Sequence, residues 1–145
     1  MKPRIYIAGP ISKGDLAANI RQASEAFFRL LKAGFAPFCP HWSAYSGGPY
    51  EAPVPQSMPN GTTHEDWLGV DLPWVSVSDA LLRLPGESVG ADREVKEAER
   101  WAVPVYYDIE KLLAVESPWM RQDVVSPLNG GIPYPPRVRA EPSLT

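Results

Sequence analysis

The 145-residue sequence predicts a single α/β domain in which a parallel sheet is flanked by helices. Short apolar runs rich in β-favouring residues alternate with longer segments whose apolar residues recur at helical spacing. The length suits one hydrophobic core and is short for two. Strands that alternate with helices pair in parallel, because each crossover helix brings the chain back in the same direction.

The chain begins with a predicted strand and helix. Residues 4–8 form an apolar run that Gly9 closes, which indicates a buried strand. Over residues 16–32 apolar side chains recur at helical spacing, and Asp15 or Ser12 can cap the start of this helix. We therefore expect the first strand and helix to be joined by a short turn.

A second strand and a long loop come next. Residues 35–39 resume the β pattern, and Pro37 favours the edge of the sheet, because proline donates no hydrogen bond. Residues 41–61 show no sustained period, which is typical of a lid or binding loop, and the alternative is a disordered segment. The aromatic side chains of this region either stack on a ligand base or attach the loop to the core. They are Trp42, Tyr45, Tyr50 and, just beyond the loop, Trp67.

The second half of the chain continues the alternation. Thr62 and Glu65 fit a capping box, which predicts a helix that runs to Val77 despite Pro73 within it. An apolar run over residues 80–84 predicts the third strand. The remaining expected elements are a helix over 90–101, a strand over 103–106 and a helix over 108–115.

This order of elements predicts a Rossmann-like or flavodoxin-like domain over residues 1–116. Residues 117–145 are rich in proline and can hardly be helical. We expect them to form an irregular C-terminal tail that wraps the surface, contacts a partner subunit or stays disordered.

Composition narrows the class of partner. The formal net charge of -3, without clustered Lys and Arg, disfavours nucleic acid. Apolar runs are too short for a signal or membrane-spanning segment, and the single cysteine, Cys39, excludes an intrachain disulfide. His41 and His64, with one distant cysteine, are too few for a metal site. We therefore expect a cytoplasmic protein that binds a small molecule and needs neither metal nor cofactor.

The turn after the third strand carries the strongest functional signal. Residues 85–90 contain Gly and Ser and open directly into a helix, so free backbone N–H groups face the carboxyl edge of the sheet. A phosphate or a sugar fits such an edge. Glu94 follows early in the helix, and Asp71 lies on the preceding one. If both face the crevice, one carboxylate can attack an anomeric carbon while the other protonates a leaving base.

A structural alternative exists for Glu94. Charged residues surround it along the predicted helix, and Asp92 with Lys96 is one possible ion pair at i and i+4. On this alternative Glu94 belongs to a solvated helix face and has no chemical role.

Several positions taken together match a known pattern. They are Tyr6 and Gly9 at the end of the first strand, Asp71-Leu72, and Ser88-x-Gly90-x-x-x-Glu94-x-x-x-Ala98. This set resembles the nucleoside 2-deoxyribosyltransferase superfamily over roughly residues 4 to 115. The likeness is closest to a small phage- and bacteria-associated branch with the same Ile-Ala-Gly-Pro and Pro-Gly-Glu-Ser segments.

The resemblance implies a role for each matched residue. Glu94 corresponds to the nucleophile on C1′ of deoxyribose, Asp71 to the acid that protonates the departing base, and Tyr6 to the residue that positions the Glu. The sugar then passes to another base or to water through the same glycosyl-enzyme intermediate. The resemblance also implies a homo-oligomer in which a neighbouring subunit completes the site.

Ser88 departs from the transferases of this family, which carry a base-binding Asp at that position. The family's nucleoside 5′-monophosphate N-glycosidases carry Ser there. A hydroxyl beside free N–H groups suits a phosphate, which an Asp would repel. We expect Gly9, Ser12, Ser88 and Gly90 to contact the nucleoside or nucleotide, although Ser12 can instead serve only as a helix cap. The second hypothesis is a noncatalytic nucleotide-binding or sensing module with the same fold.

Overall fold

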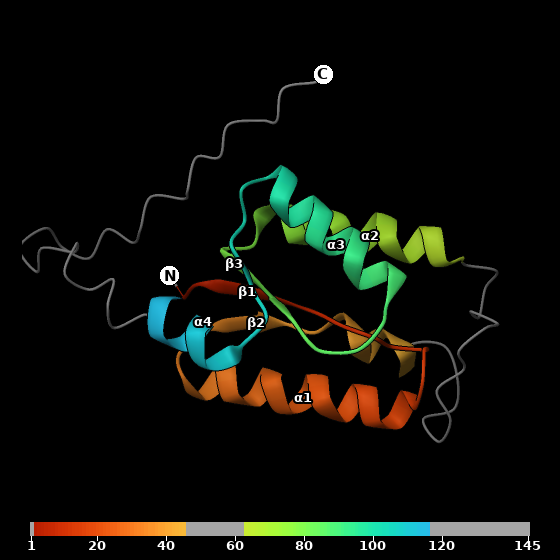
Figure 1. The fold of residues 1–145 in the computed structure, drawn as a ribbon, viewed down its shortest axis with the longest axis horizontal. Coiled ribbons are helices and arrows are strands. Elements are labelled where there is room, and N and C mark those ends of the chain that lie inside the picture. The colour runs from red at the N-terminus through yellow and green to blue at the C-terminus, as the bar shows by residue number, and fades with distance from the viewer. Residues whose placement is uncertain (1, 46–62, 117–145) are drawn as a thin grey trace, which may run out of the picture.

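The computed structural model describes residues 2–45 and 63–116, and these residues have the predicted α/β fold (Figure 1). Within them, four parallel strands form one sheet in the order β2-β1-β3-β4. The strands are β1 (Arg4–Ala8), β2 (Ala36–Phe38), β3 (Ala80–Arg83) and β4 (Val105–Tyr106). The helices are α1 (Leu16–Lys32), the 3-10 helix η1 (Pro40–Tyr45), α2 (His64–Val77), α3 (Val89–Arg100) and α4 (Ile109–Glu116).

Helices cover both faces of the sheet. In Figure 1, α1 and α4 lie below the sheet, and α2 and α3 lie above it. Because side chains alternate along a strand, β1 contributes to both cores. Ile5 and Ile7 pack with α1 and α4, whereas Tyr6 and Ala8 pack with α2 and α3. All four side chains are fully buried, so β1 is the centre of the fold.

The two outer strands are shorter than predicted, because the residues before them still belong to helix ends. The N–H of Phe35 bonds to the carbonyl of Leu30 in α1, and the N–H of Val103 bonds to the carbonyl of Ala98 in α3. Those donors are therefore unavailable to the sheet. β2 occupies an edge of the sheet, as Pro37 predicts.

The expected capping box over Thr62 and Glu65 is wrong by one residue. Thr63 is the N-cap of α2, and its hydroxyl accepts a hydrogen bond from the N–H of Asp66. The carboxylate of Asp66 accepts one in return from the N–H of Thr63 at 2.6 Å. Glu65 instead forms an ion pair with Arg93 of α3. The capping box therefore uses a Thr and an Asp, and the Glu beside them is free to join α2 to α3.

The predicted long loop begins with a helical segment, η1. The ring of Trp42 packs against Phe27 with ring centroids 4.4 Å apart, and its indole N–H donates to Oγ of Ser24. This side chain attaches η1 to α1. Trp42 therefore fits the alternative in which the aromatic side chains attach the loop to the core. The rest of the loop and the tail, residues 46–62 and 117–145, lie outside the described residues. No helix in the described part of the chain has the length and apolar character to cross a membrane.

Candidate active site

A cavity of about 680 Å³ lies at the carboxyl ends of β1 and β3. The turns after these strands, η1, α2 and the start of α3 supply its walls. From β1 the chain runs to β2 on one side, whereas β3 pairs with β1 on the other side. This reversal of strand order is where open parallel sheets bind their ligands. Six of the seven predicted site residues line the cavity. They are Gly9, Ser12, Asp71, Ser88, Gly90 and Glu94.

The seventh residue, Tyr6, contacts one of these six. Its hydroxyl donates a hydrogen bond of 2.7 Å to Oε1 of Glu94, and both side chains are buried. Burial and the neighbouring Glu94 raise the pKa of Tyr6 far above its usual range. The phenol therefore keeps its proton and acts as a donor to the carboxyl group. Sequence predicted this pairing through the family resemblance, and the geometry agrees with it.

Glu94 is a buried carboxyl group, 6% exposed, on the face of α3 that Ala91 and Ala98 also bury. Burial raises the pKa of Glu94 to about 8. The hydrogen bond from Tyr6 acts in the opposite direction, and the charge of Asp71 adds to the increase. The alternative of a solvated helix face is therefore wrong for Glu94, although Asp92 and Lys96 beside it are exposed.

Asp71 faces the same cavity from α2, which packs beside α3. Its partial burial raises its pKa to about 6. Asp71 thus ionises first, and its charge then disfavours ionisation of Glu94. At neutral pH the pair of carboxyl groups therefore holds one proton, mainly on Glu94.

Ser88 has a structural role in addition to lining the cavity. It is the N-cap of α3, and its Oγ accepts a hydrogen bond of 3.1 Å from the N–H of Ala91. The hydroxyl proton remains available for donation to a ligand. For α1 the N-cap is Asp15, whose carboxylate accepts from the N–H of Ala18. The alternative in which Ser12 serves as that cap is therefore wrong.

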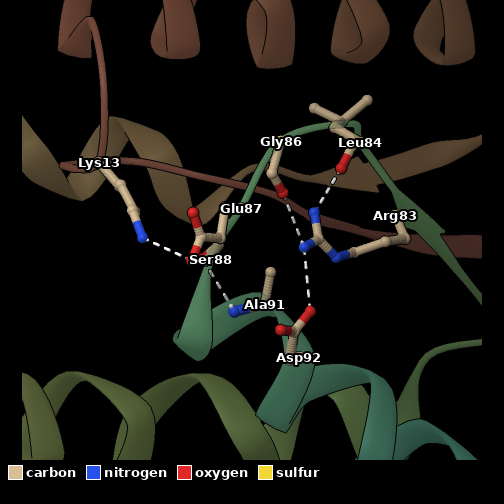
Figure 2. A network of polar contacts seen from close by, with 8 residues as sticks. All are labelled: Lys13, Arg83, Leu84, Gly86, Glu87, Ser88, Ala91 and Asp92. Atoms are coloured by element: carbon tan, nitrogen blue, oxygen red, sulfur yellow. Dashed lines mark hydrogen bonds and ion pairs between the residues drawn. The ribbon is translucent and has the colours of Figure 1, made fainter.

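The turns after β1 and β3 contact each other through Pro10 and Gly86. Gly86 adopts a φ of 115°, and a Cβ built there would lie 2.8 Å from Cγ of Pro10, so glycine is required. The guanidinium of Arg83 is buried below this turn and donates to the carbonyl oxygens of Leu84 and Gly86 and to Asp92 (Figure 2). These bonds fix the turn that presents Ser88 to the cavity.

Both histidines of the sequence lie next to glycines that line the cavity, a feature that sequence reasoning missed. A Cβ at Gly90 would lie 3.3 Å from Cε1 of His64, which itself lines the cavity. A Cβ at Gly9 would lie 3.3 Å from Nε2 of His41. Trp67 also lines the cavity. Its spacing from His64 and Asp71 is helical, so the pattern i, i+3, i+7 could have identified this face of α2.

His41 is fully buried, and its ring nitrogens have no hydrogen-bond partner among residues 2–45 and 63–116. Burial lowers the pKa of His41 to about 4, and the nearby backbone of Pro10 opposes this shift only in part. The imidazole is therefore neutral at physiological pH. Its neutral ring packs behind Gly9.

The described residues hold no group of three or more His, Cys, Asp or Glu side chains arranged to bind a metal ion. Neither the protein-family models nor the curated proteins searched include a match to the chain. The arrangement of Tyr6, Glu94 and Asp71 therefore carries the functional argument. It combines two carboxyl groups of different acidity with one fixed donor, which is suited to covalent catalysis with proton transfer.

Proposed function

We propose that the protein catalyses N-glycosyl transfer or hydrolysis on a deoxynucleoside or nucleoside 5′-monophosphate, with Glu94 as the nucleophile. The observation that carries the proposal is the buried Tyr6–Glu94 pair, which shares a cavity with Asp71. The resemblance to the nucleoside 2-deoxyribosyltransferase superfamily assigns chemistry to the same three residues. Physical and family-based reasoning thus favour the same site.

In the proposed reaction the Glu94 carboxylate attacks C1′ and forms an ester bond with the sugar. The C1′–N bond breaks, its electron pair stays on the base nitrogen, and Asp71 protonates the departing base. In the second step the oxygen of a water or a nitrogen of an acceptor base attacks C1′, Asp71 removes the proton from that oxygen or nitrogen, and the C1′–O bond to Glu94 breaks. Glu94 is released as a carboxylate, so atoms and charge balance over the two steps.

This reaction needs the proton of the pair on Asp71, whereas the pKa values of about 6 and about 8 place it mainly on Glu94. The reactive form, with the proton on Asp71 and the charge on Glu94, is therefore the minor form of the singly protonated pair. The singly protonated pair dominates between pH values of about 6 and 8. We expect a bell-shaped pH dependence of kcat/KM with a maximum near neutrality. The Tyr6 hydrogen bond supports the reactive form, because it stabilises a charged Glu94.

A 5′-phosphate on the ligand is supported by residues of the two turns that line the cavity. Ser12 and Ser88 offer hydroxyl donors there, and Lys13 offers a positive charge. Gly90 lies in the first turn of α3, four residues before Glu94, which separates the two positions by about 6 Å along the helix axis. A sugar with C1′ at Glu94 would direct its 5′ substituent toward the Ser88 turn.

A noncatalytic nucleotide-binding module is the second candidate, and one observation favours it. A Glu94 carboxyl group with a pKa of about 8 is mostly protonated at neutral pH, and a protonated carboxyl binds a ligand without attacking it. This candidate predicts ligand-induced thermal stabilisation that survives Glu94→Ala, with no base released from any substrate.

The deciding experiment is chromatographic detection of free base. The protein is incubated with a panel of deoxynucleosides and their 5′-monophosphates, with and without an acceptor base. Base release or exchange that disappears in Glu94→Ala supports glycosyl transfer, and the preferred donor distinguishes nucleosides from nucleotides. A panel without any base release contradicts the catalytic proposal.

A homo-oligomer and a cytoplasmic location remain part of the proposal. The oligomer is supported by apolar side chains exposed on α2 and β2, which a second copy of the chain would cover. They are Val70, Trp74, Val77 and Phe38. Trp74→Lys should disrupt this contact between copies. Light scattering should therefore give a lower molar mass for the variant than for the unmodified full chain.

A further inference from the structure

An ion pair connects the turns after β1 and β3, beside the cavity that Lys13 and Ser88 line. Nζ of Lys13, in the turn after β1, lies 2.6 Å from Oε1 of Glu87, in the turn after β3 (Figure 2). Both side chains are exposed, at 59% and 77%. Such surface pairs contribute little stability, so a ligand can displace one partner at low cost.

The two partners have different positions relative to the cavity. Lys13 lines it, and Glu87 is the residue directly before Ser88, the N-cap of α3. Of the described residues that line the cavity, Lys13 is the only Lys or Arg, whereas Asp71 and Glu94 contribute carboxyl groups. In the structure the positive charge of Lys13 is neutralised by Glu87. An anionic ligand must therefore compete with Glu87 for this charge.

We propose that Glu87 is a specificity-determining residue that competes with the phosphate of a phosphate monoester for Lys13. The ligand class rests on the proposed function. A dianionic phosphate at the Ser88 turn attracts Lys13 more strongly than a single carboxylate does. The Lys13–Glu87 ion pair must therefore break before the phosphate can use the charge of Lys13. The pair thus reduces affinity for phosphorylated ligands and leaves affinity for uncharged sugars unchanged.

The test is a double-mutant cycle on ligand binding. Dissociation constants for 2-deoxyribose 5-phosphate, 2-deoxyribose and inorganic phosphate are measured by calorimetry at one low ionic strength, because salt screens exposed charges. The proteins are the wild type, Glu87→Gln, Lys13→Gln and the double variant. None of these probes carries a base, so binding is read without turnover.

We expect Glu87→Gln to tighten binding of 2-deoxyribose 5-phosphate about two- to five-fold, which corresponds to the strength of an exposed ion pair. Lys13→Gln weakens it, and in that background Glu87→Gln has a much smaller effect. Binding of unphosphorylated 2-deoxyribose is unchanged in all four proteins. If inorganic phosphate binds as tightly as 2-deoxyribose 5-phosphate, the competing ligand group is phosphate alone and the sugar adds no affinity.

Glu110→Gln is the matched control, since Glu110 pairs with Arg29 through similarly exposed side chains that lie between α4 and α1. It lowers the negative charge of the chain by the same amount and leaves affinity unchanged. Unaltered or weaker binding of the sugar phosphate in Glu87→Gln overturns the proposal, as does an equal gain in Glu110→Gln. Failure of all proteins to bind either phosphate probe also overturns it. The base-release assay is independent of these binding measurements. Glycosyl transfer can therefore be refuted while the competition is confirmed, and the competition can be refuted while glycosyl transfer is confirmed.

Discussion

The hydroxyl of Tyr6, in the central strand β1, donates a hydrogen bond of 2.7 Å to Oε1 of Glu94, 88 residues later on α3. This bond joins the two parts of the chain that carry the clearest sequence signals. It also favours the charged form of a carboxyl group that burial otherwise keeps protonated. Tyr6 therefore acts on the proposed chemistry through Glu94 and is a positioning residue.

Replacing Tyr6 with Phe should move the alkaline limb of the pH profile of kcat/KM to higher pH. Without the donor, the pKa of Glu94 rises above its value of about 8, so fewer molecules hold the proton on Asp71. Each unit of increase lowers kcat/KM at neutral pH about ten-fold. The profile is measured with the best substrate of the panel. A lower rate with an unmoved limb would show that Tyr6 has only a packing role.

Glu94→Gln should abolish base release and make stability less dependent on pH. Loss of a nucleophile lowers kcat by at least about a thousand-fold. The folded pKa of about 8 lies above the ordinary value of 4.5. The stability linked to Glu94 is therefore fully present below pH 4.5 and is lost as pH rises through about 8.

Urea unfolding at several pH values measures this loss, and the Gln variant should show a flatter dependence over the same range. Glu99→Gln is the control, because Glu99 is exposed on the same helix and should change neither activity nor the pH dependence. A Gln variant whose unfolding free energy still declines over that range would refute the assignment to Glu94.

His41→Leu should stabilise the protein by about 1 kcal/mol, because it removes buried polar atoms that have no partner among the described residues. The folded pKa of about 4 lies below the ordinary value of 6.5. The stability linked to His41 is present above pH 6.5 and is lost as pH falls through about 4. The Leu variant should therefore resist acid better, as measured by thermal unfolding. His64→Leu, at an exposed position, is the control; equal effects of both changes would contradict the prediction.

Ser88→Asp should change the preferred ligand without loss of the helix cap. Aspartate caps helices as well as serine does, so the free energy of unfolding should change by less than about 0.5 kcal/mol. Its carboxylate would repel a 5′-phosphate at the Ser88 turn. We expect the ratio of base release from monophosphates to that from nucleosides to decrease at least about ten-fold. An unchanged ratio would remove Ser88 from the phosphate subsite.

The fold was predictable because its local signals agree. Alternating strand and helix patterns determine the parallel sheet, and Pro37 identifies its edge strand. The capping box was misplaced because Thr62 and Thr63 each have an acidic residue three positions later. The two spacings are equivalent in sequence, and only the hydrogen bonds of Thr63 and Asp66 distinguish them.

The candidate site was predictable in part. Glu94, Asp71 and Tyr6 follow from a turn between strand and helix together with a family resemblance. The positions of His41 and His64 depend on how η1 and α2 pack against the turns, and residues distant in sequence decide that packing. The ion pair of Lys13 and Glu87 was not predictable for the same reason, because it forms only once two turns that are distant in sequence pack together.

The position of β1 between β2 and β3 determines which part of the molecule moves least. Its backbone is bonded on both sides, and its side chains are covered on both faces. Its amides should exchange with deuterium only in global unfolding, whereas those of the Lys13 and Glu87 turns exchange through local opening. Tyr6 thus holds Glu94 from a strand that is paired on both sides, while the residues proposed to select the ligand, Lys13 and Glu87, have exposed side chains on turns outside the sheet.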